Sequence, residues 1–221
     1  MTVAQDLLLV ALDPGSGKVR LPSTSSDVAL GGAALTDLVL LGRLELVGEG
    51  RKAKVGVRDH AAVDDPDLQA AFERVRQRGP QVPKNVVGRL GKKQRKAVLA
   101  TLVRDGVLRD REEKVLGFAV ERFELVDVAR RDALLGRLRQ VLLHGQPADG
   151  TTGPLVGLLL ATDQLGLVVE DRRDRKAAKA RAKEVADGDW ASEGVRKAIQ
   201  EAQLALTTAV VASTTAATSG S

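Results

Sequence analysis

The chain has 221 residues and a formal net charge of +5, from 34 basic and 29 acidic side chains. It has no cysteine, which excludes disulfides, thiolate metal sites and cysteine nucleophiles. Aromatic residues make up only 2 % of the chain, so Leu, Val and Ala must build the core, and this composition favours helices with a minor sheet component. No apolar run reaches the ~18 residues that a membrane span needs, and the first residues do not read as a signal peptide.

The first half of the chain predicts three helices and one β-hairpin. Apolar residues recur at helical spacing and are stopped by clusters of Gly and Pro. Asp64 or Asp65 is expected to cap the third helix, with Pro66 in its first turn. These helices are expected at residues 4–12, 27–41 and 64–78, with a loop at 22–27. Alternating residues predict the hairpin at 43–47 and 52–58.

The second half predicts further helices around a second hairpin. Helices are expected at residues 86–90, 92–105, 127–143 (capped by Asp127), 155–165, 171–187 and 193–212. The second hairpin is expected to turn at residues 110–113 and to return along 114–123. Residues 1–212 are interpreted as one domain and 213–221 as a disordered tail. The predicted fold class is mainly α, a single helical domain with small β-hairpins.

Residues for catalysis or metal binding are not apparent in the sequence. His60 and His144 do not stand at ligand spacing from other metal ligands. The loop at residues 13–19 lacks the spacing of a phosphate-binding loop, and no nucleophile elbow occurs. We therefore expect no enzyme, no metal and no cofactor.

Several segments, in order along most of the chain, resemble the Golgi phosphoprotein family. Members of this family are peripheral Golgi proteins that read phosphatidylinositol-4-phosphate, and the family has bacterial relatives. The bias towards Ala, Val, Gly and Arg resembles a high-GC bacterium. The segments are Asp6-Leu7-Leu8-Leu9-Val10-Ala11-Leu12, Gly32-Ala33-Ala34-Leu35-Thr36-Asp37-Leu38-Val39-Leu40-Leu41-Gly42-Arg43-Leu44-Glu45-Leu46, Leu102-Val103-Arg104-Asp105-Gly106-Val107-Leu108, Phe123-Glu124-Leu125-Val126-Asp127, Ala161-Thr162-Asp163-Gln164-Leu165 and Gly188-Asp189-Trp190.

The resemblance implies a mostly helical fold, a basic pocket for a lipid head group, and an apolar hairpin that touches the membrane or a second subunit. In the eukaryotic members, the pocket uses a Trp and an Arg before the long N-terminal helix and two Arg residues three apart on a later helix. Alignment on the shared segments puts Pro22 and Gly31 at the first two positions. It puts Lys92 and Arg95 at the other two, so the later half of the pocket keeps its charge.

Apart from the resemblance, the residues of this region support anion binding in general rather than binding of a phosphoinositide. Lys92, Lys93, Arg95 and Lys96 are expected near a helix start, where cations and free backbone N–H groups can converge on a phosphate. Each basic side chain near an anionic membrane contributes roughly 1 kcal/mol. The alternative interpretation is a helix face that Lys merely keeps solvated.

The second hairpin carries apolar residues that one buried face does not explain. Val115 and Leu116 are consecutive, so an apolar side chain would stand on each face of the strand. Leu116 and Phe118 are therefore candidates for insertion into a membrane interface or for a contact between subunits. Ordinary packing on the domain is the alternative for Phe118.

The favoured function is a non-enzymatic adaptor that binds anionic phospholipid on the cytoplasmic face of a membrane, with phosphoinositide binding implied by the resemblance. One alternative is a winged-helix nucleic-acid-binding protein, since a helix, Gly106 and a two-stranded segment follow one another. Nucleic acid is the less favoured partner, because the basic residues lie at the start of that helix and aromatics are few. The other alternative is a protein scaffold, or a homo-oligomer, that acts through the hairpin.

Overall fold

The computed structural model describes residues 1–21, 23–48, 52–111, 113–115 and 118–188, and the single positions 200, 204 and 207. For residues 23–25, 114, 115, 118 and 119 the backbone alone is described. Within these residues the chain forms eight α-helices, a 3-10 turn and four pairs of short antiparallel strands. The predicted class, mainly α with small β-hairpins, is confirmed.

The helices are α1 (Val3–Ala11), α2 (Ser23–Leu40), α3 (Pro66–Arg76), α4 (Pro83–Gly91), α5 (Gln94–Arg104), α6 (Val128–Leu143), α7 (Thr152–Ala161) and α8 (Arg175–Asp187), with the 3-10 turn η2 at Leu165–Leu167. The strands are β1 (Leu12–Asp13), β2 (Lys18–Val19), β3 (Leu44–Val47), β4 (Lys54–Val57), β5 (Leu108–Asp110), β6 (Glu113–Val115), β7 (Phe118–Val120) and β8 (Phe123–Leu125). They pair as β1–β2, β3–β4, β5–β8 and β6–β7.

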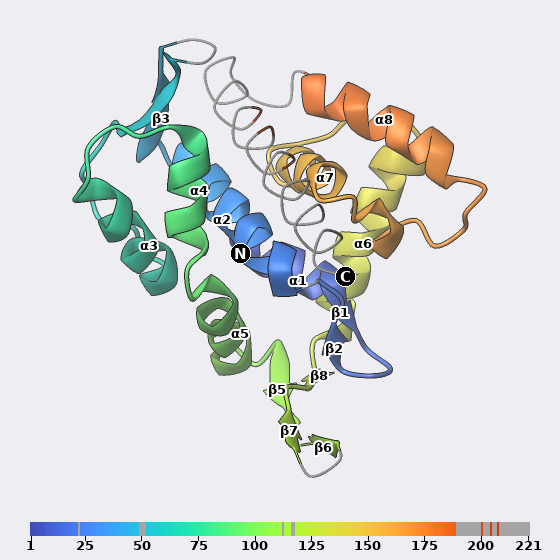
Figure 1. Cartoon of the computed structure of the whole chain (residues 1–221). Helices are drawn as coiled ribbons and strands as arrows, with labels where there is room; N and C mark the ends of the chain where they lie inside the picture. Colours follow the sequence, from blue (N-terminus) through green and yellow to red (C-terminus); the bar gives the residue numbers. More distant parts are fainter. Residues whose placement is uncertain are drawn as a thin grey trace, which may run out of the picture.

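The helices α1 and α2 lie at the centre of the molecule, with α3, α4 and α5 on one side and α6, α7 and α8 on the other (Figure 1). All nine residues of α1 are buried, and in α7 the leucines at positions 155, 158 and 159 are fully buried. A helix that is apolar all round has to be covered on every side. For this reason α1 and α7 lie inside, whereas α8 buries only a narrow stripe of Ala178, Ala182 and Val185.

Two of the predicted helix starts are confirmed, and a third is wrong. The Asp65 carboxylate accepts hydrogen bonds from the N–H groups of Asp67 and Leu68, and Asp127 caps α6 in the same way. The long helix α2, however, begins at Ser23 rather than near residue 27. The Ser- and Thr-rich segment predicted as a loop forms its first turn, because hydroxyl residues suit helix starts as well as loops.

Arginine side chains from distant parts of the chain donate hydrogen bonds to carbonyl oxygens at several helix C-termini. Buried Arg131 donates hydrogen bonds of 3.1 Å to the carbonyl oxygens of Leu9 and Leu12 at the end of α1. Arg181 of α8 donates to Val141 near the end of α6. The last carbonyls of a helix lack partners within it, and a guanidinium has several donors in a fixed plane. These contacts satisfy the carbonyls and tie the helices to one another.

The second hairpin is longer than the sequence predicts, and its turn is elsewhere. We call the strands β5, β6, β7 and β8 the ribbon; β5 pairs with β8 at its base and β6 with β7 further out. Asp110 pairs with Phe123, the backbone N–H of Arg111 donates to the carbonyl oxygen of Arg122, and Glu113 pairs with Val120, so these residues belong to the ladder where a turn was expected. Polar residues do not mark a turn here, because both faces of a projecting strand tolerate water. Beyond this point β6 pairs with β7, from Glu113 with Val120 to Val115 with Phe118.

Several expectations lie outside the described residues. These are Pro22, Leu116, most of the helix expected at 193–212, and the tail at 213–221. The interpretation of residues 1–212 as one domain stays a prediction. The first hairpin is confirmed, with β3 and β4 paired in register from Leu44 with Val57 to Val47 with Lys54.

Candidate functional site

The chain turns sharply between α4 and α5, at a segment that we call the α4–α5 junction (residues 91–96). α4 ends at Gly91, Lys92 leaves the helical conformation, and Lys93 has a left-handed backbone with a φ of 62°. A left-handed residue cannot continue a right-handed helix. The helix start expected at residue 92 is therefore wrong: Lys92 lies on the turn, and Arg95 and Lys96 lie in the first turn of α5.

The four cations of the junction differ in their surroundings. Lys92, Lys93 and Lys96 are exposed, whereas 27 % of the Arg95 side chain is exposed. The Arg95 guanidinium donates a 2.9 Å hydrogen bond to the Glu121 carboxylate, which follows β7 on the ribbon. The structure therefore brings the two residues predicted for head-group binding, Lys92 and Arg95, to one turn of the backbone.

The junction is fixed in space by a close crossing of α2 and α4. A Cβ atom added at Gly91 would lie 1.9 Å from the carbonyl oxygen of Asp27, and one added at Gly31 would lie 2.1 Å from that of Val87. Both contacts are to backbone, which cannot swing aside as a side chain can. Gly31 therefore has no room for a side chain, so an arginine cannot be built at that position without moving α4.

Arg74 of α3 holds the junction from the other side. Its Nε–H donates to the carbonyl oxygen of Arg89, and its Nη2 donates to those of Leu90 and Lys92, each at 3.3 Å. Burial lowers the pKa of the Arg74 guanidinium from its ordinary value, but a guanidinium remains protonated in proteins. Three unpaired carbonyls at the end of α4 thus find donors in one side chain. Sequence reasoning missed this residue, because the contact joins positions 15 to 18 residues apart.

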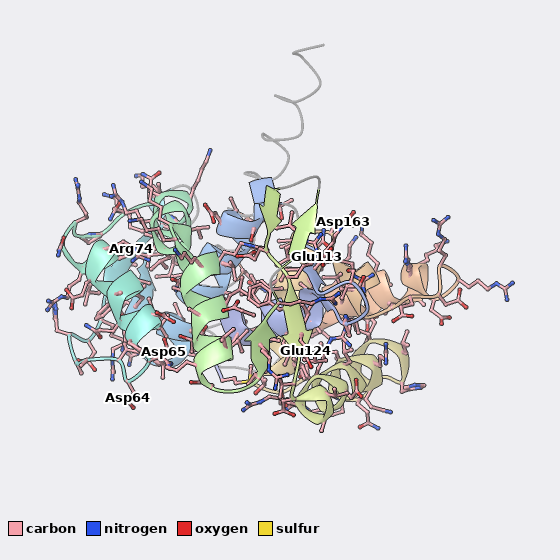
Figure 2. All side chains as sticks on the ribbon, turned by 90° about the horizontal axis from the view of Figure 1, so that it is seen from below. Asp64, Asp65, Arg74, Glu113, Glu124 and Asp163 are labelled. Carbon is pink, nitrogen blue, oxygen red and sulfur yellow. The ribbon has the colours of Figure 1, made fainter. Side chains whose placement is uncertain are left out.

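The ribbon projects away from the helices (Figure 1). Figure 2 shows Glu113 and Glu124 on its strands, apart from α3 with Arg74. Phe118 begins β7 opposite Val115, and only the backbone of both residues is described. The ion pair between Arg95 and Glu121 connects the base of this projection to the junction. The two predicted contact elements are therefore joined in the folded chain.

A cavity away from the α4–α5 junction is lined by Asp37, a residue that sequence reasoning did not single out. An open cavity of about 570 Å³ lies at the start of α1 and the end of α2, and neither Lys92 nor Arg95 lines it. Asp37 lies in its wall and accepts hydrogen bonds from the N–H groups of Val3 (2.8 Å) and Ala4 (3.4 Å). Burial raises the pKa of Asp37 to about 7, although these two N–H groups oppose the shift. An Asp between the apolar residues of the second half of α2 was the available signal.

The described residues contain neither a metal-binding cluster nor a membrane-spanning helix. Nowhere in that part of the chain do three or more His, Asp or Glu side chains gather as a metal site would require. None of the helices described is both long enough and apolar enough to cross a bilayer.

The sequence model of the Golgi phosphoprotein 3 (GPP34) family matches residues 3–202, which is most of the chain. The chain belongs to this family. The match spans α1 to α8, including the α4–α5 junction and the ribbon, so both predicted contact elements lie within the part shared with the family. No curated protein sequence matches the chain closely enough to be called similar.

Proposed function

We propose that this Golgi phosphoprotein family member is a peripheral membrane protein that binds anionic phospholipid head groups through the α4–α5 junction. It acts without catalysis, as an adaptor. The observation that supports this most is the fixed turn that carries Lys92, Lys93, Arg95 and Lys96. The glycine crossing and Arg74 hold this turn in place, so the backbone that presents the cations is already ordered before a ligand binds.

The magnitude of the attraction is modest. Each basic residue near an anionic surface contributes about 1 kcal/mol, so the three exposed lysines supply about 3 kcal/mol before Arg95 is counted. A single weak signal of this size gives only reversible binding. A second contact is therefore required, and the projecting ribbon is placed to supply it.

We assign the ribbon contact to Phe118, at the start of β7, and to Leu116, which lies outside the described residues. Apolar side chains at the end of a projection can enter a bilayer interface with little loss of packing elsewhere. A contact with a second copy of the chain is the other use of such a surface. Measurement of the mass in solution separates the two, as described in the Discussion.

The structure argues for general anion binding rather than recognition of one phosphoinositide. Gly31 leaves no space for the arginine that the family resemblance implies at that position. The cations that remain are mostly lysines, which act as point charges and do not form the bidentate fork of an arginine. We assign the cytoplasmic face of the membrane, because anionic lipids are concentrated in that leaflet.

The test is cosedimentation of the purified protein with phosphatidylcholine vesicles that contain about one third phosphatidylserine, at low salt. Lys92→Glu combined with Arg95→Glu changes the net charge from +5 to +1, since each replacement removes two charges. We expect the partition coefficient to fall roughly a hundredfold or more. The circular dichroism spectrum should stay unchanged, because Lys92 is exposed and the partly exposed ion pair of Arg95 with Glu121 contributes only about 0–1 kcal/mol to stability.

The matched control is Lys176→Glu with Lys183→Glu on the exposed side of α8, which gives the same net charge of +1. This variant should keep most of the binding, because the cations it removes lie on a different helix. If the α8 variant loses as much binding as the junction variant, net charge alone explains the interaction. If the junction variant sediments like the wild type, the lipid site lies elsewhere.

A further inference from the structure

The ion pair between Arg95 and Glu121 is unlike the other charge contacts of this region. It joins two residues that are 26 positions apart and belong to different elements, α5 and the ribbon. Its neighbours on the ribbon, Arg109 with Glu124 and Arg122 with Glu113, connect strands of the ribbon itself. Of the four junction cations, Arg95 is the one that has an ion-pair partner among the described residues.

The carboxylate of Glu121 therefore occupies Nη2 of Arg95, one of the donor groups to which an incoming phosphate could bind. Carboxylates and phosphates bind a guanidinium through the same planar N–H groups, so the two anions exclude each other at the donor they share. Half of the Glu121 side chain is exposed to solvent, so its attraction to Arg95 is screened. Such an exposed pair is weak enough for a dense anionic surface to displace.

We infer that Glu121 is an internal competitor that occupies Arg95 until an anionic surface displaces it, and that it thereby sets the surface charge density at which the protein binds. This inference rests on the proposed function of the junction. It makes Glu121 a residue that determines affinity without contacting the ligand.

The same contact links the junction to the ribbon. When a head group takes Arg95, the base of the outer ribbon loses its ion pair to α5, while Arg122 and Glu113 still join the two arms of the ribbon. Coupling of this kind is reciprocal: whatever draws Glu121 away from Arg95 raises the affinity of Arg95 for anions. Any movement of the ribbon that separates Glu121 from Arg95 therefore favours binding of a head group.

The experiment is a titration of the full chain and its variants with phosphatidylcholine vesicles of increasing phosphatidylserine content. Glu121→Gln should bind about two- to fivefold more tightly than the wild type, the range of an exposed ion pair. It should also reach half-saturation at a lower phosphatidylserine content. The control is Glu124→Gln, which removes the same charge from the neighbouring strand β8, where Glu124 pairs with Arg109. It should change the affinity less.

The deciding comparison repeats Glu121→Gln in a chain that already carries Arg95→Gln. If Glu121 competes for Arg95, its gain falls in this background to that of the Glu124→Gln control. An equal gain in both backgrounds would show a long-range charge effect and overturn the inference. So would an unchanged affinity in Glu121→Gln while Arg95→Gln alone weakens binding. If neither single change alters binding, Arg95 is outside the lipid site, and the proposed site fails together with the inference.

Discussion

The replacement of Gly31 by Ala tests the helix crossing that fixes the junction. The new Cβ atom would lie 2.1 Å from the carbonyl oxygen of Val87, whereas real Cβ contacts shorter than 3.0 Å essentially do not occur. The shortfall is about 0.9 Å, and the obstructing atom is backbone. The helices α2 and α4 must therefore move apart by about 1 Å along a crossing that is otherwise closely packed.

The expected loss of stability follows from two opposed effects. Replacing Gly by Ala inside a helix normally stabilises by about 1 kcal/mol. Overpacking in a rigid core costs about 1–3 kcal/mol, and more where the obstacle cannot rotate away. The obstacle here is the backbone carbonyl of Val87, so we expect overpacking to cost about 2–4 kcal/mol and the net loss in the free energy of unfolding to be about 1–3 kcal/mol. We also expect weaker binding to anionic vesicles, because the shift of α4 displaces Lys92.

The matched control is Gly88→Ala, on the exposed side of the same helix α4, where an added Cβ meets nothing within 4 Å. This variant should gain about 0.5–1 kcal/mol. The free energies of unfolding of the two variants, measured with urea, should differ by about 2–4 kcal/mol. In thermal unfolding this corresponds to a difference of about 5–15 °C in Tm for a chain of this size. A Gly31→Ala variant as stable as Gly88→Ala would refute the close crossing.

Four other results are expected. Arg74→Met should lower the unfolding free energy by about 1–3 kcal/mol, because three carbonyls lose their donor, and it should also weaken vesicle binding. Arg181→Met removes a comparable contact at the end of α6, so it should lower the stability but leave vesicle binding unchanged. Leu116→Ser with Phe118→Ser should weaken cosedimentation but keep its salt dependence; a change of mass in light scattering with unchanged vesicle binding would instead identify a subunit contact. Vesicles of equal charge made with phosphatidylinositol-4-phosphate or with phosphatidylserine should bind alike, and a strong preference for the phosphoinositide would contradict the loss of its pocket. Folding raises the pKa of Asp37 from 3.8 to about 7, so between these two pH values the folded state keeps a proton that the unfolded state releases. The free energy of unfolding should therefore fall as the pH rises from 3.8 to about 7, by at most about 4 kcal/mol, and then level off. Urea unfolding across that range should show a flatter profile for Asp37→Asn.

The helices were predictable where a local signal exists. An apolar run that is stopped by the Gly- and Pro-containing segment at 13–17 predicts α1, and the side chains of Asp65 and Asp127 cap the helices that they precede. These signals lie within a few residues of what they determine, so the sequence carries them directly. The start of α2 was missed because Ser and Thr suit a loop and a first helical turn equally well.

The site was predictable as a set of charges but not as a shape. Lys92 and Arg95 could be named, but the left-handed backbone of Lys93 between them could not. That turn depends on the contact of Gly91 with α2 and on the hydrogen bonds from Arg74. Contacts between distant segments leave no periodic pattern in a single sequence, so the junction could not be built from it. The same reason hides Glu121, which is recognisable as a partner of Arg95 only in the fold.

The measurement that tests anionic-membrane binding at the junction most directly is parallel binding of the wild type and the Lys92→Glu/Arg95→Glu variant to anionic vesicles, neutral vesicles and duplex DNA in one buffer. Salt dependence alone does not separate lipid from DNA, because both are polyanionic surfaces. We expect the wild type to bind the anionic vesicles, to ignore the neutral ones and to bind DNA much more weakly, and we expect the variant to bind none of them. Tighter binding to duplex DNA than to anionic vesicles, lost in the same variant, would contradict this and identify the junction as a nucleic-acid contact.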